Sequence, residues 1–149
     1  VVSPDLGAVR LAERYARLLD LPMAVVHKTR VGAADVATTG LTGEVRGRRP
    51  IVVDDMISTG GTIEAAVRAL LDAGAEADIV VAATHAVLPR QAALRLAPLP
   101  IRRLVASDSV EAPADSAVPI ERVGVAPLLA EAIARLHRGE PIRDLVSRT

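Results

Sequence analysis

The chain has 149 residues, of which 50% are hydrophobic and 24% charged, a composition that argues against disorder. Its 18 basic and 18 acidic residues give a formal net charge of zero, and Tyr15 is its only aromatic residue. Binding to nucleic acid or to a membrane surface is therefore not expected, because it needs excess positive charge or stacking rings. The absence of cysteine excludes disulfides and thiolate metal sites and favours a cytoplasmic protein.

Short β-branched runs alternate with longer runs of helical period, which is typical of an α/β fold with a parallel sheet. The chain opens on the end of a strand, Val1 and Val2, and its first residue is not Met. We therefore expect that a segment precedes it in the natural protein. An apolar stripe at helical spacing then predicts an amphipathic helix over residues 7–20. The members of this stripe are Leu11, Tyr15, Leu18 and Leu19.

Residues 23–27 read as the second strand, and they are followed by a long stretch, 29–47, with little apolar periodicity. A connection of this length tends to be functional or mobile, although a β-hairpin of residues 36–39 with 43–46 could lie inside it. Residues 50–53 form a buried strand by composition. A Ser/Thr/Gly turn then leads into a helix that runs to about residue 73, where Gly74 ends it.

The rest of the chain continues the alternation of strands and helices. Strands are expected at 79–83, 103–106 and 121–125, and helices at 90–96 and 127–137, with 108–119 as a loop. Pro127 suits the first turn of the last helix, because its missing N–H has no intrahelical acceptor there. The sequence thus predicts a single α/β domain over residues 1–149, with a parallel sheet of five or six strands flanked by helices.

The most specific segment is 51–62, where a buried strand ends in two carboxylates and a turn leads into a helix. Ligands bind at the carboxyl ends of the strands in an open parallel sheet, so Asp54 and Asp55 should lie in or beside a crevice. Adjacent carboxylates cannot hold a phosphate. They can accept hydrogen bonds from vicinal sugar hydroxyls, or share a Mg²⁺ ion.

The turn itself suits a phosphate monoester. Unpaired backbone N–H groups at a helix N-terminus bind anions, hydroxyl groups add donors, and glycine lets the backbone come close to the ligand. The residues concerned are Ser58, Thr59, Gly60, Gly61 and Thr62. Strand, carboxylates and turn together predict a sugar phosphate as ligand; the alternative is a helix-capping cluster with no ligand. No Gly-Lys-Thr sequence follows at the spacing of a nucleotide-binding P-loop.

The 51–62 segment resembles the phosphoribosyl pyrophosphate signature shared by type I phosphoribosyltransferases and ribose-phosphate pyrophosphokinases. Further segments look like the C-terminal half of a pyrophosphokinase, in the same order and over almost the whole chain. These segments are 2–7, 27–30, 43–45, 84–85, 129–133 and 139–140. The resemblance implies a phosphoribosyltransferase-like fold with a flexible loop after the second strand, and it implies that the N-terminal half of a two-domain enzyme is absent.

The resemblance also implies roles for individual residues. Asp54 and Asp55 would bind the ribose 2- and 3-hydroxyls, and residues 58–62 would wrap the 5-phosphate. Lys28 and Arg30 would be catalytic, at the root of a loop that closes over ATP. Asp5 would lie near Mg²⁺ and the ribose C1 hydroxyl. For Lys28, the only lysine in the chain, the alternative is a solvated surface charge, and for Asp5 it is a helix cap.

The implied reaction is transfer of the diphosphoryl group of ATP to ribose 5-phosphate, which gives phosphoribosyl pyrophosphate and AMP. The implied cofactor is Mg²⁺, and the implied assembly is a homo-oligomer, often a hexamer built from dimers. We expect the isolated 149 residues to bind ribose 5-phosphate without turning it over.

Two other functions remain open at this point. A phosphoribosyltransferase would need a pocket for a base, usually with aromatic stacking, and Tyr15 on the first helix supports one poorly. A non-catalytic regulatory subunit would have no physical requirement to keep Lys28, Arg30, Asp54 and Asp55.

Overall fold

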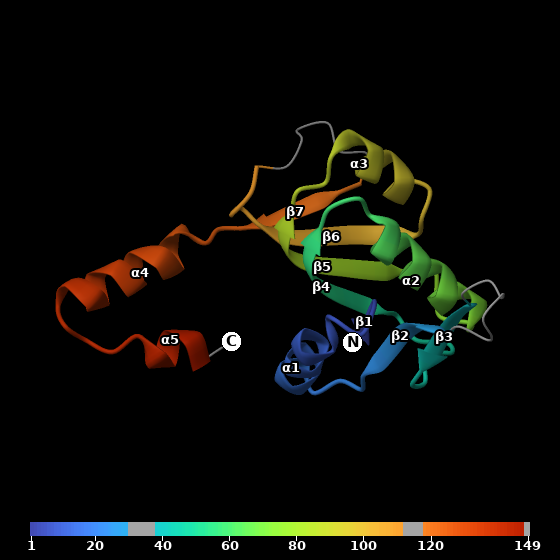
Figure 1. Cartoon of the computed structure of the whole chain (residues 1–149), viewed down its shortest axis with the longest axis horizontal. Coiled ribbons are helices and arrows are strands. Elements are labelled where there is room, and N and C mark those ends of the chain that lie inside the picture. The colour runs from blue at the N-terminus through green and yellow to red at the C-terminus, as the bar shows by residue number, and fades with distance from the viewer. Residues whose placement is uncertain (30–37, 112–117, 148–149) are drawn as a thin grey trace.

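The computed structural model describes residues 1–29, 38–111 and 118–147, and its centre is a seven-stranded sheet (Figure 1). The order of the strands is β3-β2-β1-β4-β5-β6-β7, and every pairing is parallel except that of β2 with β3. The strands are β1 (Val2–Ser3), β2 (Ala24–Thr29), β3 (Thr38–Thr42), β4 (Ile51–Ile57), β5 (Ile79–Ala86), β6 (Ile101–Ser107) and β7 (Ile120–Val123). The helices are α1 (Val9–Leu19), α2 (Gly61–Asp72), α3 (Arg90–Leu96), α4 (Ala126–His137) and α5 (Arg143–Ser147). The predicted α/β class with a largely parallel sheet is confirmed.

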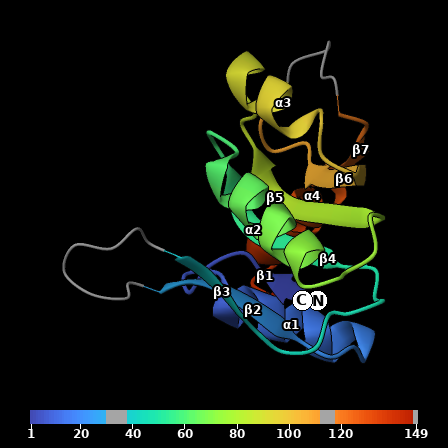
Figure 2. The ribbon, with the colours of Figure 1, turned by 90° about the vertical axis from the view of Figure 1, so that its right-hand side faces the viewer.

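The direction in which the chain adds strands changes between β1 and β4, which are neighbours in the sheet. From β1 the chain passes through α1 to β2 and β3, whereas from β4 it passes through α2 and α3 toward β7. Figure 2 shows the β2–β3 pair at the opposite end of the sheet from β7. Because right-handed crossovers in opposite directions place helices on opposite faces, a crevice opens at the carboxyl ends of β1 and β4.

The core lies between the sheet and helices α2 and α3. Val52 and Val53 on β4 are fully buried, and α2 buries one face of apolar side chains against the sheet. That face consists of Ile63, Ala66, Val67 and Leu70. Its i, i+3, i+4, i+7 spacing is the helical period read from the sequence. The strand of the 51–62 segment, β4, and the helix that follows it, α2, are therefore held by the same core.

Helix α1 turns a different face to the sheet from its predicted apolar stripe. Its buried residues are Ala12 and Ala16, whereas Tyr15, Leu18 and Leu19 are 37%, 59% and 48% exposed. Small side chains allow a helix to approach a sheet closely, so the alanine face is the one that packs. The stripe of large apolar residues was thus correct as evidence for a helix and wrong as a guide to its buried face.

The predicted hairpin of residues 36–39 with 43–46 is wrong. Residues 36–37 lie outside the described part, residues 43–46 form no strand, and β3 pairs instead with β2, in a register that runs from Val25↔Thr42 to Thr29↔Thr38. This antiparallel edge strand is the seventh strand, one more than expected. The β2 backbone offers the free hydrogen-bonding edge that β3 uses.

The last helices extend away from the sheet (Figure 1). The predicted helix at 127–137 is present as α4, with Pro127 in its first turn, but α4 has no buried residue. Helix α5 was not predicted. Arg135 on α4 forms ion pairs with Glu131 and with Asp144 of α5, which ties the two helices together. Within the described residues, no helix is long and apolar enough to cross a membrane.

Candidate functional site

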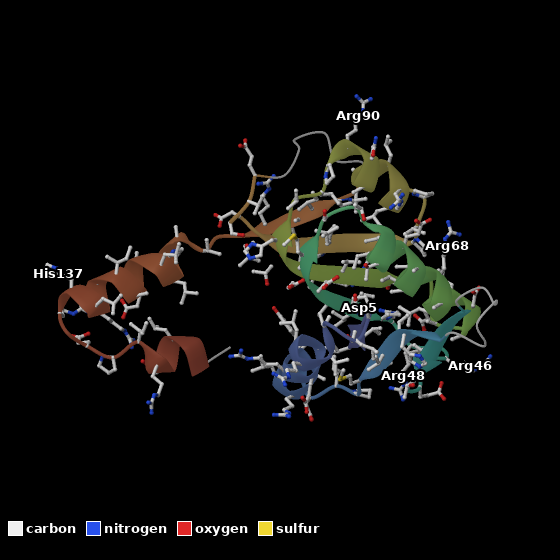
Figure 3. All side chains as sticks on the ribbon, in the orientation of Figure 1. Asp5, Arg46, Arg48, Arg68, Arg90 and His137 are labelled. Atoms are coloured by element: carbon white, nitrogen blue, oxygen red, sulfur yellow. The ribbon has the colours of Figure 1, made fainter. Side chains whose placement is uncertain are left out.

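The carboxyl edge of the sheet at β1 and β4 brings together residues that are far apart in the sequence. Asp5 follows β1, Asp54 and Asp55 lie within β4, and Thr62 is in the first turn of α2. Figure 3 shows Asp5 between α1 and β4. The strand was expected to end in the two acidic residues, yet β4 continues beyond them to Ile57, because its backbone pairing with β5 persists at Asp54↔Ala83 and Met56↔His85.

Two adjoining cavities open at this edge and share Thr62. The smaller, about 90 Å³, is enclosed by Asp54 and the turn that begins α2. The larger, about 350 Å³, lies between the loop after β1, β2 and α2, and its lining includes Asp5 and His27. The adjoining volumes suit an elongated ligand that carries an anionic group at the turn and hydroxyl groups at the carboxylates.

The turn from β4 into α2 exposes backbone donors. Gly60 is the N-cap of α2 with φ +74°, a left-handed conformation that favours glycine, and no side chain caps the helix. The first N–H groups of a helix have no intrahelical acceptor. Because the positive end of the helix dipole adds to these donors, the turn can bind an anion such as a phosphate.

The two carboxylates of β4 have different surroundings. Consecutive strand residues point to opposite faces, and accordingly Asp54 is partly buried while Asp55 is exposed. Asp54 Oδ1 accepts a hydrogen bond from the backbone N–H of Asp55 at 2.9 Å. Burial raises the pKa of Asp54 to about 6, and the nearby negative charges of Asp5 and Asp55 add to this rise. Asp54 is thus an acceptor whose charge a cation or a hydroxyl-bearing ligand would stabilise.

The raised pKa predicts that Asp54 destabilises the fold at neutral pH. The folded chain binds this proton more tightly than the unfolded chain, whose Asp pKa is about 3.9, so ionisation removes stability as pH rises from about 4 to about 6. Asp54→Asn retains the Oδ1 acceptor and removes the charge. By calorimetry, the variant should have a Tm about 2–4 °C above that of the parent at about pH 7.5, and the gap should shrink at about pH 4.5. An equal gap at both pH values would contradict this origin of the shift.

Asp5 shapes the loop that follows β1. Its Oδ1 accepts hydrogen bonds from the N–H groups of Gly7 (2.8 Å) and Ala8 (3.1 Å), just before α1. The hydroxyl of Ser3, which is fully buried, donates to the Asp5 carbonyl at 2.6 Å. Asp5 therefore holds the turn before α1 and does not cap the helix itself, whose N-cap is Ala8 without a side-chain hydrogen bond. Its carboxylate lies at the border of the larger cavity.

The carboxyl edge of the sheet could bind Mg²⁺ only together with a ligand, because the described side chains there do not form a complete metal site. No group of three or more His, Asp or Glu side chains in the described ranges could hold a metal ion by itself. Mg²⁺ usually keeps several waters and binds one or two carboxylates together with the phosphates of its substrate. Asp5 fits this pattern as a single carboxylate beside a cavity of ligand size.

The residues proposed as catalytic are only partly described. Lys28 lies in β2, where its backbone is in register with Thr39 of β3, and Arg30 lies outside the described residues. Next to Lys28, His27 lines the larger cavity, and its Nε2 is 3.2 Å from Thr42 Oγ1. His27 has no local sequence signal of a site residue, because its place at the cavity depends on the pairing of β2 with its neighbours in the sheet.

Another cavity of about 380 Å³ lies at the opposite edge of the sheet, near the amino ends of β1, β2 and β4. Arg48 and Arg49 are among its lining residues. None of the carboxylates or hydroxyls of the 51–62 segment reaches it. Its chemistry therefore does not match the ligand predicted from the sequence, although its volume is slightly larger.

Comparison with known proteins agrees with this geometry. Residues 1–98 match the sequence profile of the family described as "Phosphoribosyl transferase domain". The chain belongs to this family. It is 41% identical over 146 residues to a ribose-phosphate pyrophosphokinase of Caldanaerobacter subterraneus subsp. tengcongensis. The aligned region covers 97% of this chain and 46% of the relative. It is 42% identical over 149 residues to the enzyme of that name from Mycobacterium tuberculosis, with 97% and 45% covered.

A solved structure extends the likeness to the fold. The crystal structure of phosphoribosylpyrophosphate synthetase from Mycobacterium smegmatis matches with a TM-score of 0.82 and 39% identity, over 93% of this chain and 44% of that one. The phosphoribosyltransferase-like fold and the resemblance to ribose-phosphate pyrophosphokinases are thereby confirmed. The chain spans about half the length of the curated relatives it matches.

Proposed function

We propose that this chain is one domain of a ribose-phosphate pyrophosphokinase and that it provides the ribose 5-phosphate site. The observation that carries the proposal is the pairing of a carboxylate-bearing strand with an uncapped, glycine-led helix start at the switch point of the sheet. A sugar phosphate has hydroxyl groups that can donate to the carboxylates of the strand, and a phosphate group that can bind at the start of the helix. The similarity to ribose-phosphate pyrophosphokinases over 97% of the chain supports this substrate.

In the proposed complex, the 5-phosphate lies on the N–H groups and hydroxyls of residues 58–62. Asp54 and Asp55 accept hydrogen bonds from the ribose 2- and 3-hydroxyls, Asp54 from within the smaller cavity and Asp55 from the exposed end of β4 outside it. The C1 hydroxyl then faces the larger cavity beside Asp5. This placement fixes the orientation of the sugar at both ends. Fixed orientation lowers the entropic part of the barrier to group transfer.

The proposed reaction joins the C1 oxygen of ribose 5-phosphate to the β-phosphorus of ATP. The bond from that phosphorus to the bridging α–β oxygen breaks, AMP leaves with that oxygen, and the proton of the C1 hydroxyl is released to solvent. Lys28 and Arg30 would stabilise the charge that is redistributed on the β-phosphate. Mg²⁺, bound through Asp5, waters and phosphate oxygens, would neutralise phosphate charge when present.

The two alternative functions have less support. Tyr15, the only aromatic residue, lies on α1 and lines neither cavity of the carboxyl edge. A stacked base, as a phosphoribosyltransferase would need, has no aromatic partner in this chain. A regulatory role is tested by the experiments on Asp54, Asp55 and Lys28. A homo-oligomeric assembly is part of the proposal, and sedimentation of the purified protein would test it.

Calorimetric titration of the chain with ribose 5-phosphate and with phosphoribosyl pyrophosphate, each with and without Mg²⁺, tests the proposed site. We expect binding of both, and the double variant Asp54→Asn/Asp55→Asn should weaken it by at least about tenfold, since charge-assisted hydrogen bonds are lost. The control Asp72→Asn/Glu111→Gln makes the same change in charge away from the site and should bind normally. Full affinity in the Asp54→Asn/Asp55→Asn variant would refute the site, and turnover by the isolated chain would refute its expected inactivity.

A further inference from the structure

Helix α3 packs against the outside of the turn that begins α2. A Cβ atom added to Gly60 would lie 3.3 Å from Leu96 Cγ and 3.5 Å from Ala92 Cβ, so glycine is needed there for close approach as well as for its positive φ. Ala92 and Leu96 are fully buried. The turn is therefore held from behind by a helix that lies outside the 51–62 segment.

Arg95 of α3 adds a polar contact to this packing. Its Nη1 donates a hydrogen bond to the Thr59 carbonyl oxygen at 3.0 Å, and its Nε lies 3.3 Å from Glu64 Oε2 on α2. Glu64 also pairs with Arg68, through Oε1. The ion pair with Glu64 orients the guanidinium, so that one of its N–H edges is directed at a single backbone carbonyl of the turn.

Fixing this carbonyl also fixes the next N–H group. The peptide bond between Thr59 and Gly60 is planar and trans, so its C=O and N–H point in opposite directions. When the Thr59 oxygen faces Arg95, the Gly60 N–H faces away from α3. Gly60 lines the cavity of about 90 Å³ that also includes Asp54 and Ser58.

We propose that Arg95 is a positioning residue for the phosphate of the ligand: it holds the Thr59–Gly60 peptide so that the Gly60 N–H is directed into the smaller cavity. This inference rests on the proposed ribose 5-phosphate site. It adds a residue from a different helix, about 35 positions beyond the turn, which donates to the protein backbone and not to the ligand.

Two measurements on ligand-free and ligand-bound protein test the inference: the ¹⁵N–¹H resonance of the Gly60 amide, and the Kd for ribose 5-phosphate. Arg95→Met keeps the aliphatic stem and removes the donor. It should shift the Gly60 amide resonance before any ligand is added, and it should raise the Kd about five- to tenfold. Arg95→Lys retains one donor and should recover part of the affinity.

Arg68→Ala is the matched control, because it removes the other cation on Glu64 from a side chain that points away from the sheet (Figure 3). It should leave both the Gly60 resonance and the Kd near those of the parent. An unshifted Gly60 resonance in Arg95→Met would overturn the inference, even if affinity fell, since Arg95 would then contact the ligand directly. Equal effects of Arg68→Ala and Arg95→Met would overturn it as well.

If the parent chain binds no ribose 5-phosphate, the proposed function fails in its own titration, whereas the Gly60 resonance still decides whether Arg95 orients the peptide.

Discussion

Lys28→Ala is expected to lower kcat for phosphoribosyl pyrophosphate synthesis by about 100- to 1000-fold, which is the typical loss on removing one group that stabilises transition-state charge. Because we propose that this chain is one domain of a longer enzyme, the assay needs the remaining part as well. A chimera would therefore join this chain to the N-terminal half of the Mycobacterium smegmatis synthetase, whose structure it matches with a TM-score of 0.82. Lys28 is the only lysine and lies on the strand next to β1, so its β2 position adjoins the carboxyl edge at Asp5.

Two controls separate chemistry from overall charge. Arg10→Ala removes a cation from the exposed side of α1 and should leave kcat unchanged. Lys28→Arg retains the charge with a different geometry, and it should fall between the parent and Lys28→Ala because a planar guanidinium does not replace a point charge. If Lys28→Ala keeps nearly full activity in an active chimera, the catalytic assignment fails. A regulatory role for the chain would then be favoured.

The residues at the turn could be predicted because their signal is local. A buried strand, two adjacent carboxylates and a turn with two glycines occupy twelve consecutive positions, and each part needs only its neighbours to form. Parallel strands place their carboxyl ends on one edge, so Asp5 and Asp54 follow from the strand assignments alone. The positive φ of Gly60 is the conformation that such a turn requires.

Features set by distant pairing could not be read in this way. The position of β3 is set by its pairing with β2. The sequence of a strand does not identify the strand with which its backbone pairs, so this position could not be predicted. The same holds for Arg95, whose contact with Thr59 joins residues on two different elements. On α1, both the alanines and the large apolar residues have helical spacing, and only the close approach to the sheet selects the alanines.

The acidic residues of the site also show why it depends on a ligand. Asp54 is partly buried within reach of the charges of Asp5 and Asp55, an arrangement that costs stability in the free protein and raises the pKa of Asp54 to about 6. Sugar hydroxyls or a cation would offset that cost on binding. Ligand affinity should consequently fall as pH drops through about 6, where Asp54 takes up a proton and becomes a weaker acceptor.

Gly43→Ala is expected to destabilise the fold by about 2–4 kcal/mol, which is large beside the total stability of a domain of this size. Gly43 has φ +108°, and an added Cβ would lie 2.8 Å from three atoms of the β2 entry: Ala24 Cα, Ala24 Cβ and the Met23 carbonyl oxygen. Two of these belong to the backbone and cannot rotate away. The chain must pass this close because β3 ends at Thr42, in register with Val25.

Urea unfolding of Gly43→Ala and Gly47→Ala provides the matched comparison. Gly47 has φ +65° with nothing within 4 Å of its added Cβ, so its substitution should cost only about 1–2 kcal/mol of left-handed backbone strain. The excess loss in Gly43→Ala then measures the steric clash between the end of β3 and the start of β2. Equal losses in the two variants would mean that the backbone at Gly43 and at the start of β2 moves apart without cost to make room for the methyl group. The end of β3 would then not fix the position of β2 beside the carboxyl edge.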